Sequence, residues 1–158
     1  MKLTTTQKAY LAGLIDGEGY IYFRRRSGDS KWWGGVQINI TNKKIISTLL
    51  EWVGGGTPIW NKGSENKKWM PRYRWEIGAK DSEKLLNQIK RYMIIKKENA
   101  ELYLKYRKTF KGRKYGRGVR VSSQVEKERF ELVKQYREMM AKQTVRRGGY
   151  LDVTHGIL

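Results

Sequence analysis

The sequence predicts an α+β domain in the order helix, two strands, helix, two strands, helix (αββαββα), with one extra helix at the C-terminal end. Apolar residues recur at helical spacing in some segments, whereas others alternate strictly between apolar and polar residues. The alternating segments come in two pairs, which is typical of strands with one buried and one exposed face. A chain of 158 residues is long enough for one domain with a real core. We therefore expect helices on one face of a four-stranded antiparallel sheet.

The first helix is expected to begin at Thr4, because Thr4 and Gln7 have the spacing of a capping box. It should end within residues 17–19, since glycine readily ends a helix. Residues 20–26 and 36–41 then form a strand pair joined by a turn at 28–30. The predicted inner face carries Ile21, Phe23, Val36, Ile38 and Ile40, and the outer face carries Tyr20, Tyr22, Arg24, Arg26, Gln37, Asn39 and Thr41.

The rest of the chain repeats this order. A helix over 43–53 ends at three glycines, and strands follow at about 57–62 and 72–79, then helices at about 82–92 and 96–109. We expect one domain over 1–158, made of a core over about 4–109, a basic connector over 110–121, a C-terminal helix over about 123–141 and a tail over 142–158.

Small residues line one face of the first helix. Ala9, Gly13 and Gly17 are four residues apart, and residues at this spacing are neighbours on a helix surface. A face without bulky side chains lets another backbone approach closely. Glu18 would then lie where two such helices meet. Paired carboxylates beside backbone carbonyls offer oxygen ligands for a hard divalent cation.

The nine residues 11–19, LAGLIDGEG, resemble the signature motif of the LAGLIDADG homing endonucleases. They differ at the seventh and eighth positions, where Gly17 and Glu18 replace Ala and Asp. The resemblance implies the family's αββαββα fold with a concave sheet. Because the motif occurs once, it also implies the single-motif group, whose members are homodimers and are encoded in introns. The dimer interface would then contain Ala9, Gly13 and Gly17.

The resemblance further implies a hydrolase that cuts both strands of a long, pseudo-palindromic DNA site and leaves short 3′ overhangs. The cofactor would be Mg²⁺, or another divalent cation such as Mn²⁺, held by the Glu18 carboxylate and the Gly17 carbonyl. Carried over by position, Asn42 would order water near the reacting phosphate, with Gln37 a weaker candidate. Lys96 would lie beside that phosphate, and Lys97, the next residue, is the alternative candidate.

The charge of the chain favours a polyanionic partner. Thirty-four Lys and Arg against fifteen Asp and Glu leave a formal net charge of +19. Because the chain has no Cys, disulfides and thiol catalysis are excluded, and the single His, His155, is interpreted as a residue of the C-terminal tail. Polar side chains suited to bases and phosphates recur on the predicted outer face and in the connector. The predicted DNA contacts are Tyr22, Arg24, Arg26, Gln37, Asn39, Lys62, Arg72, Arg74, Lys111 and Arg113.

Two other functions remain open from the sequence. The basic run over 105–120 also suits RNA, as in a maturase that assists intron splicing. A third reading is a regulator that binds DNA without cutting it. The sequence has no long apolar run, so we expect no membrane span. Because Met1 lies close to the first helix, we expect no signal peptide and a protein of the cytoplasm or an organelle interior.

Overall fold

The computed structural model describes residues 1–25, 32–63, 71–110 and 121–145, the side chains of 143–145 excepted. The chain divides into two compact units, Met1–Lys108 and Thr109–Leu158. The candidate site lies in the first unit. The expectation of a single domain over 1–158 stays a prediction.

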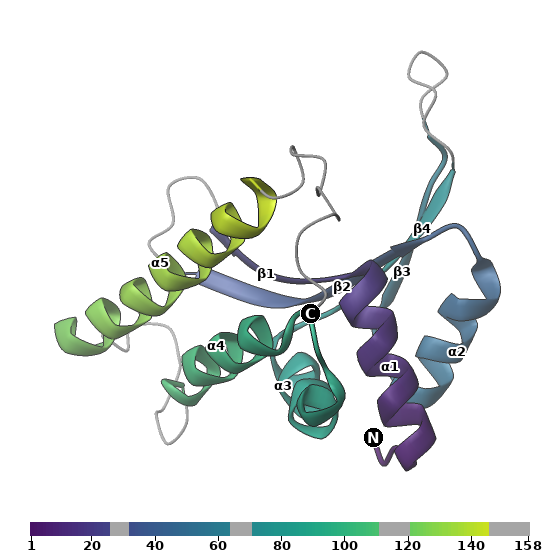
Figure 1. The fold of residues 1–158 in the computed structure, drawn as a ribbon, viewed down its shortest axis with the longest axis horizontal. Coiled ribbons are helices and arrows are strands. Elements are labelled where there is room, and N and C mark those ends of the chain that lie inside the picture. The colour runs from purple at the N-terminus through teal and green to yellow at the C-terminus, as the bar shows by residue number, and fades with distance from the viewer. Residues whose placement is uncertain (26–31, 64–70, 111–120, 146–158) are drawn as a thin grey trace, which may run out of the picture. The chain divides into compact units, whose positions relative to one another are not determined.

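The first unit follows the predicted order of helices and strands (Figure 1). Its elements are α1 (Thr5–Glu18), β1 (Gly19–Arg25), β2 (Trp32–Ile40), α2 (Lys43–Val53), β3 (Thr57–Asn61), β4 (Arg72–Ile77), α3 (Ala79–Ile89), the 3-10 turn η1 (Lys90–Tyr92) and α4 (Lys97–Lys108). The α+β prediction is confirmed, and the observed β2 begins four residues earlier than predicted.

The four strands form one antiparallel sheet in the order β1-β2-β4-β3. Its two central strands, β2 and β4, come from different strand pairs of the sequence. Helices α1 to α4 lie on the same side of the sheet, where they contact β1, β2 and β4 (Figure 1). The opposite face of the sheet carries none of the helices that the structure describes in this unit.

Local capping fixes where the helices begin and end. The Thr4 hydroxyl accepts from the Gln7 backbone N–H at 3.2 Å, while the Gln7 side chain accepts from the Thr4 N–H at 2.9 Å, as predicted. The end of α2 is a left-handed glycine, Gly54, with φ of 72°. By contrast, α1 passes directly into a strand, because Gly19 has extended backbone angles.

The core lies between the helices and the inner face of the sheet. Alternation in the strands predicted this face correctly: Val36, Ile38, Trp75 and Ile77 are all buried. From the helices, Leu11 and Ile15 of α1 join the same cluster, whose members are all apolar. This burial is the main force that holds the unit together.

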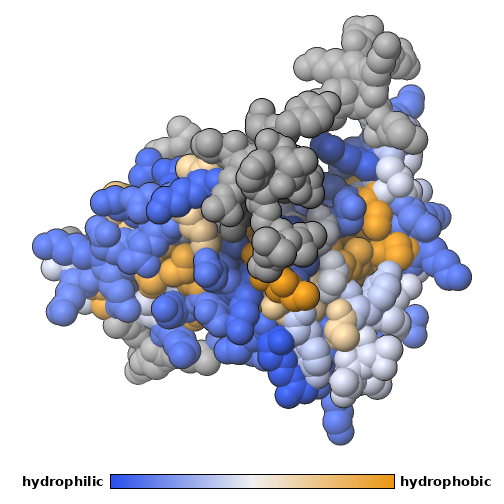
Figure 2. All heavy atoms as spheres, in the orientation of Figure 1, coloured by the Kyte–Doolittle hydropathy of each residue, from blue (hydrophilic) through white to orange (hydrophobic). Residues whose placement is uncertain are grey.

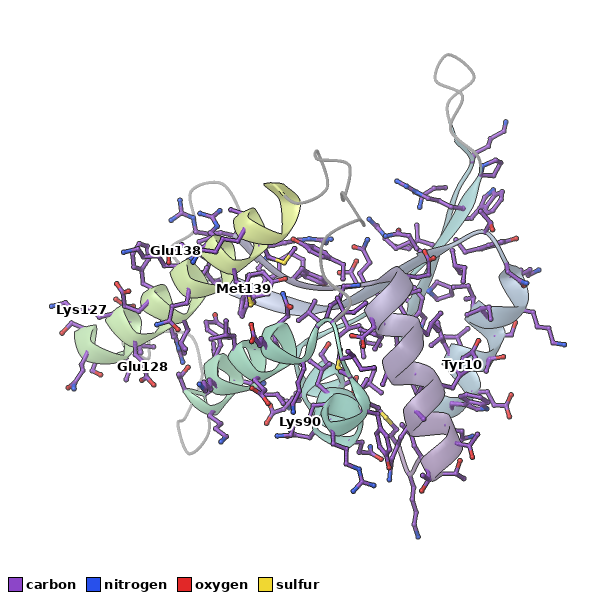
Figure 3. The ribbon with its side chains drawn as sticks, viewed as in Figure 1. Tyr10, Lys90, Lys127, Glu128, Glu138 and Met139 are labelled. Carbon is purple, nitrogen blue, oxygen red and sulfur yellow. The ribbon has the colours of Figure 1, made fainter. Side chains whose placement is uncertain are left out.

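The second unit contains α5 (Ser123–Val145), which begins where predicted and runs a few residues further. The Arg129 guanidinium donates to the hydroxyl of Thr109 at 2.8 Å and lies 3.7 Å from the ring centre of Phe110. Charges of both signs project from the helix, among them Lys127, Glu128 and Glu138 (Figure 3). The helix is therefore tied to the start of its own unit and carries a mixed-charge surface.

Hydrophilic residues cover most of the visible surface (Figure 2). Among the residues that the structure describes, no helix has both the length and the apolar character needed to cross a membrane.

Candidate active site and nucleic-acid interface

The C-terminal end of α1 carries the residue predicted to be catalytic. Glu18 is the last residue of the helix and its side chain is exposed. Gly19 follows at once and donates its N–H to the carbonyl of Ile15. A Cβ added at Gly19 would lie 2.7 Å from Cα of Ile15, so only glycine allows this tight passage from helix to strand.

Asp16, two residues before Glu18, has the opposite surroundings. Its side chain is buried and accepts three backbone hydrogen bonds, from Ile94 at 2.7 Å, Ile95 at 3.2 Å and Lys96 at 2.9 Å. These N–H groups lie between η1 and α4. Asp16 therefore fastens the end of α1 to the start of α4, 78 to 80 residues away in the chain.

Lys96 completes this connection from the other side. Its ammonium donates to the carbonyl of Ile15 at 2.9 Å and to the carbonyl of Asp16. A cation is favourable there, because the last carbonyls of a helix carry partial negative charge. The structure thus brings Lys96 to the helix end that carries Glu18. Its predicted rival, Lys97, is exposed and opens α4.

The two predicted amide residues have different roles in the structure. Asn42 is the N-cap of α2, where its side-chain oxygen accepts from the Lys44 N–H at 2.9 Å. Gln37 lies in β2 and is buried on the open face of the sheet, where its oxygen accepts from the Arg24 guanidinium at 2.6 Å. Both side-chain oxygens are therefore engaged within the chain.

The small-residue strip faces outward. Ala9, Gly13 and Gly17 are all exposed, whereas Leu11, Ala12 and Ile15 are buried. A Cβ added at Gly13 or Gly17 would meet nothing within 4 Å. Tyr10, on the side of α1 that faces α2, meets Trp52 edge-on at 5.6 Å (Figure 3). Among the described residues of the first unit, nothing packs so closely that glycine would be required at positions 13 and 17.

The donor set at the end of α1 would supply only part of a metal site. In the parts of the chain that the structure describes, no three His, Cys, Asp or Glu side chains gather where they could hold a metal ion. Asp16 is committed to backbone N–H groups, and Lys96 occupies the carbonyls of Ile15 and Asp16. Glu18 is the one exposed carboxylate at this end of α1. This donor set fits half of a carboxylate site for a hard divalent cation.

The open face of the sheet carries a connected polar cluster. Arg24 lies 4.1 Å above the ring centre of Tyr22, and its NH1 is 3.5 Å from the Glu76 carboxylate. The hydroxyl of Tyr22 donates to the same carboxylate, and Nε of Arg74 lies 3.9 Å from its second oxygen. We call Tyr22, Arg24, Gln37, Arg74 and Glu76 the sheet-face cluster.

Tyr22 corrects one prediction about this face. It points to the open side as expected, but only 1% of it is exposed, because Arg24 covers its ring and Trp33 packs edge-on against it at 5.7 Å. Burial, the hydrogen bond to Glu76 and the charge of Glu76 raise the pKa of Tyr22 far above its usual range. Tyr22 therefore supports the surface and does not form it.

Two of the other predicted DNA contacts, Asn39 and Arg72, lie on the same face of the sheet. Asn39 pairs with Arg74 across β2 and β4, and Asn61 of β3 pairs with Arg72, which is exposed. Lys62 is exposed directly after β3. Arg26, Lys111 and Arg113 lie outside the described residues.

No protein-family model matches the sequence, and no curated protein matches it. Solved structures do match the fold. An archaeal intron-encoded homing endonuclease, I-Vdi141I in complex with DNA, superposes with a TM-score of 0.64 and 17% identity over 84% of this chain and 83% of that chain. The chain has the LAGLIDADG homing-endonuclease fold. The homing endonuclease I-CvuI, in complex with its target, matches with a TM-score of 0.55 and 14% identity, over 83% of this chain and 94% of that one. The meganuclease I-SmaMI, bound to DNA, matches with a TM-score of 0.60 and 16% identity, over 79% of this chain and 42% of that chain.

Within the LAGLIDADG fold, the structure gathers some predicted site residues and separates others. Lys96 binds carbonyls at the end of α1 that carries Glu18, whereas Gln37 belongs to the sheet-face cluster and Asn42 caps α2. Sequence reasoning missed Asp16 and Glu76. A signal for Asp16 existed, since it lies four residues after the buried Ala12 and therefore on the inner face of α1. Glu76 had a weaker signal: in the strands as described, it is the sole acidic residue.

Proposed function

We propose that the protein is a homing endonuclease that acts as a homodimer and cuts double-stranded DNA with the help of a divalent cation. The observation that carries the proposal is the exposed Glu18 at the end of a helix whose outer face is a strip of small, unobstructed residues. The similarity to homing endonucleases solved with DNA supports it.

The small-residue strip supports the dimer. If two copies of α1 pack along Ala9, Gly13 and Gly17, a two-fold axis runs between them, and the same residues meet from both sides. The two Glu18 side chains then lie close to that axis. Each copy would contribute its own four-stranded sheet, so the symmetric dimer would contact two symmetric half-sites on the DNA.

In such a dimer the two negatively charged Glu18 carboxylates would repel each other, and a bound divalent cation would relieve this repulsion. Magnesium suits a site with few carboxylates, because it keeps several waters and readily accepts phosphate oxygens. Bound there, the cation supplies neutralisation of the phosphate charge and a more acidic water. Complexes of I-CvuI have been solved with calcium and with magnesium.

The chain's own residues prepare this site. Asp16 fixes the backbone that carries Glu18, and Lys96 adds a positive charge beside it, favourable for a phosphate that approaches. The arginines of the sheet-face cluster offer donors to guanine or phosphate, and Asn39 offers an amide to adenine. The net charge of +19 would attract the duplex from a distance.

The test begins with selection of cleaved sites from a randomised duplex library in the presence of Mg²⁺. We expect a selected site, carried on a plasmid, to be cut in Mg²⁺ and left intact in EDTA. The variant Glu18→Gln should bind this site with unchanged affinity but cut it at least about 100-fold more slowly, since it keeps the shape and loses the charge.

Three results would point elsewhere. Specific binding without cleavage across Mg²⁺, Mn²⁺ and Ca²⁺ would make the protein a DNA-binding regulator. Cleavage by Glu18→Gln at the wild-type rate would remove Glu18 from the reaction. Splicing of an intron stimulated by Glu18→Gln, with no selected DNA site, would support the RNA maturase.

A further inference from the structure

Glu76 is out of place on a surface meant for DNA. It lies on the open face of the sheet, and its charge has the same sign as the phosphates. Such repulsion acts over roughly 8 Å at physiological salt, a short distance that still covers a docked duplex. An acidic residue in this position needs a local reason.

The geometry supplies that reason. One oxygen of Glu76, Oε1, accepts from the Tyr22 hydroxyl and lies 3.5 Å from the Arg24 guanidinium. The other, Oε2, faces Nε of Arg74 at 3.9 Å. The carboxylate therefore lies between two arginines that approach it from neighbouring positions of the sheet.

Arg24 is held on several sides at once. Its guanidinium rests on the Tyr22 ring at 4.1 Å, lies 5.6 Å from the ring centre of Trp33 and donates to Gln37 at 2.6 Å. Even so, 37% of its side chain is exposed. A guanidinium that is both oriented and exposed is prepared for a flat, bidentate contact such as the edge of guanine.

Arg74 is less tightly held. Its Nε is buried and makes no hydrogen bond to any residue that the structure describes. The Glu76 carboxylate lies just beyond hydrogen-bond distance of this atom. A small closing movement would satisfy Nε and fix the outer part of the guanidinium.

From these contacts we propose that Glu76 is a specificity-determining residue: it orients Arg24 and Arg74 toward base edges and keeps them from binding phosphates at any sequence. Glu76 acts through the two arginines and is therefore a positioning residue. This inference rests on the proposed function, since it concerns how the same surface recognises DNA.

The experiment compares Glu76→Gln with the wild type in two assays without cleavage, in Ca²⁺. One is selection from a randomised duplex library, and the other is affinity for the selected site and for random duplex at several salt concentrations. We expect Glu76→Gln to lose its preference at guanine positions, with the ratio of specific to random affinity falling about tenfold. Affinity for random duplex should rise, with a steeper salt dependence, because freed arginines contact phosphates.

Glu83→Gln is the matched control. Glu83 is exposed to 17%, against 18% for Glu76, and also pairs with an arginine, Arg107 at 3.2 Å, but between the helices α3 and α4. Both variants lose one negative charge and a partly buried pairing with arginine, to Arg24 and Arg74 in one case and to Arg107 in the other. We expect Glu83→Gln to leave the specificity ratio unchanged.

Tyr22→Phe separates orientation from charge. It removes the hydroxyl that fixes Oε1 and keeps both the ring and the carboxylate. The specificity ratio should fall a few-fold with no gain in affinity for random duplex. Full specificity in a folded Glu76→Gln protein would overturn the inference and leave the proposed function intact, whereas a wild type without any preferred DNA would overturn the proposed function itself.

Discussion

Two carboxylates lie two residues apart at the end of α1, and the structure treats them in opposite ways. Asp16 is buried against the segment before α4, where three backbone N–H groups hold it, whereas Glu18 is exposed beside the strip of small residues. The inner side of the helix end is thus built for rigidity, whereas the outer side carries the contact with a partner that we propose above. The difference shows that the same side-chain chemistry serves structure or function according to the helix face that carries it.

Each face of the sheet carries a buried tyrosine. Tyr103, on α4, donates to the backbone carbonyl of Gly34 at 3.0 Å on the covered side, while Tyr22 donates to Glu76 on the open side. Burial raises the pKa of Tyr103 to about 12, and burial also raises that of Tyr22. The open face therefore contains a buried layer of its own beneath its arginines.

Removing Asp16 should have the largest effect on stability. Asp16→Ala leaves three backbone N–H groups without their acceptor, so we expect the free energy of unfolding to fall by about 3 kcal/mol. Chemical denaturation followed by circular dichroism measures this loss. Asp16→Asn keeps one acceptor oxygen and should lose less.

The exposed neighbour is the control for this comparison. Glu18→Gln should change the free energy of unfolding by no more than about 0.5 kcal/mol, as for other surface substitutions. Equal losses in Asp16→Ala and Glu18→Gln would remove the distinction between the two sides of the helix end.

Larger side chains on the outer strip of α1 should weaken the proposed dimer without lowering the stability of the single chain. Nothing lies within 4 Å of a Cβ built at Gly13, so Gly13→Ala should stabilise the isolated fold by up to about 1 kcal/mol. Gly13→Leu should weaken a close helix contact by about 1–3 kcal/mol. Analytical ultracentrifugation with and without DNA checks this expectation.

A leucine elsewhere on an exposed helix surface tests whether the position matters. Ser47→Leu, on the exposed side of α2, should leave the association constant unchanged. A wild type that stays monomeric at micromolar concentration, both free and on DNA, would contradict the shared site.

Alkaline pH should reveal the burial of Tyr103 in the stability of the fold. Because folding raises the pKa of Tyr103 from 10.0 to about 12, the folded state holds its proton more tightly than the unfolded chain. Its contribution is complete below pH 10.0 and is lost as the pH rises toward 12, by on the order of 2 kcal/mol. Unfolding of wild type and Tyr103→Phe between pH 9 and 12 should show a shallower decline in the variant. An identical decline in both proteins would argue against a buried phenol.

Local signals predicted most of the fold. The Thr4 cap, the glycine at the end of α2 and the alternation in β4 depend on residues close together in the chain, and the structure confirms each. The sequence placed Tyr22 on the correct face of the sheet but predicted an exposed side chain, whereas the side chain is buried. Its burial results from Arg24 and Trp33, which the sheet register brings over it, and the sequence does not contain that register.

By itself the sequence determined the order of the elements, the small-residue face of α1 and the place of Glu18 at its end, because these follow from periodicity and spacing along one segment. Only the tertiary structure decided that Asp16 fastens α1 to α4, that Lys96 reaches the same helix end and that Glu76 pairs with Arg24 across the sheet. Each of these contacts joins residues about 50 to 80 positions apart or crosses between strands. Their partners are chosen by the packing of whole elements, which no local pattern encodes.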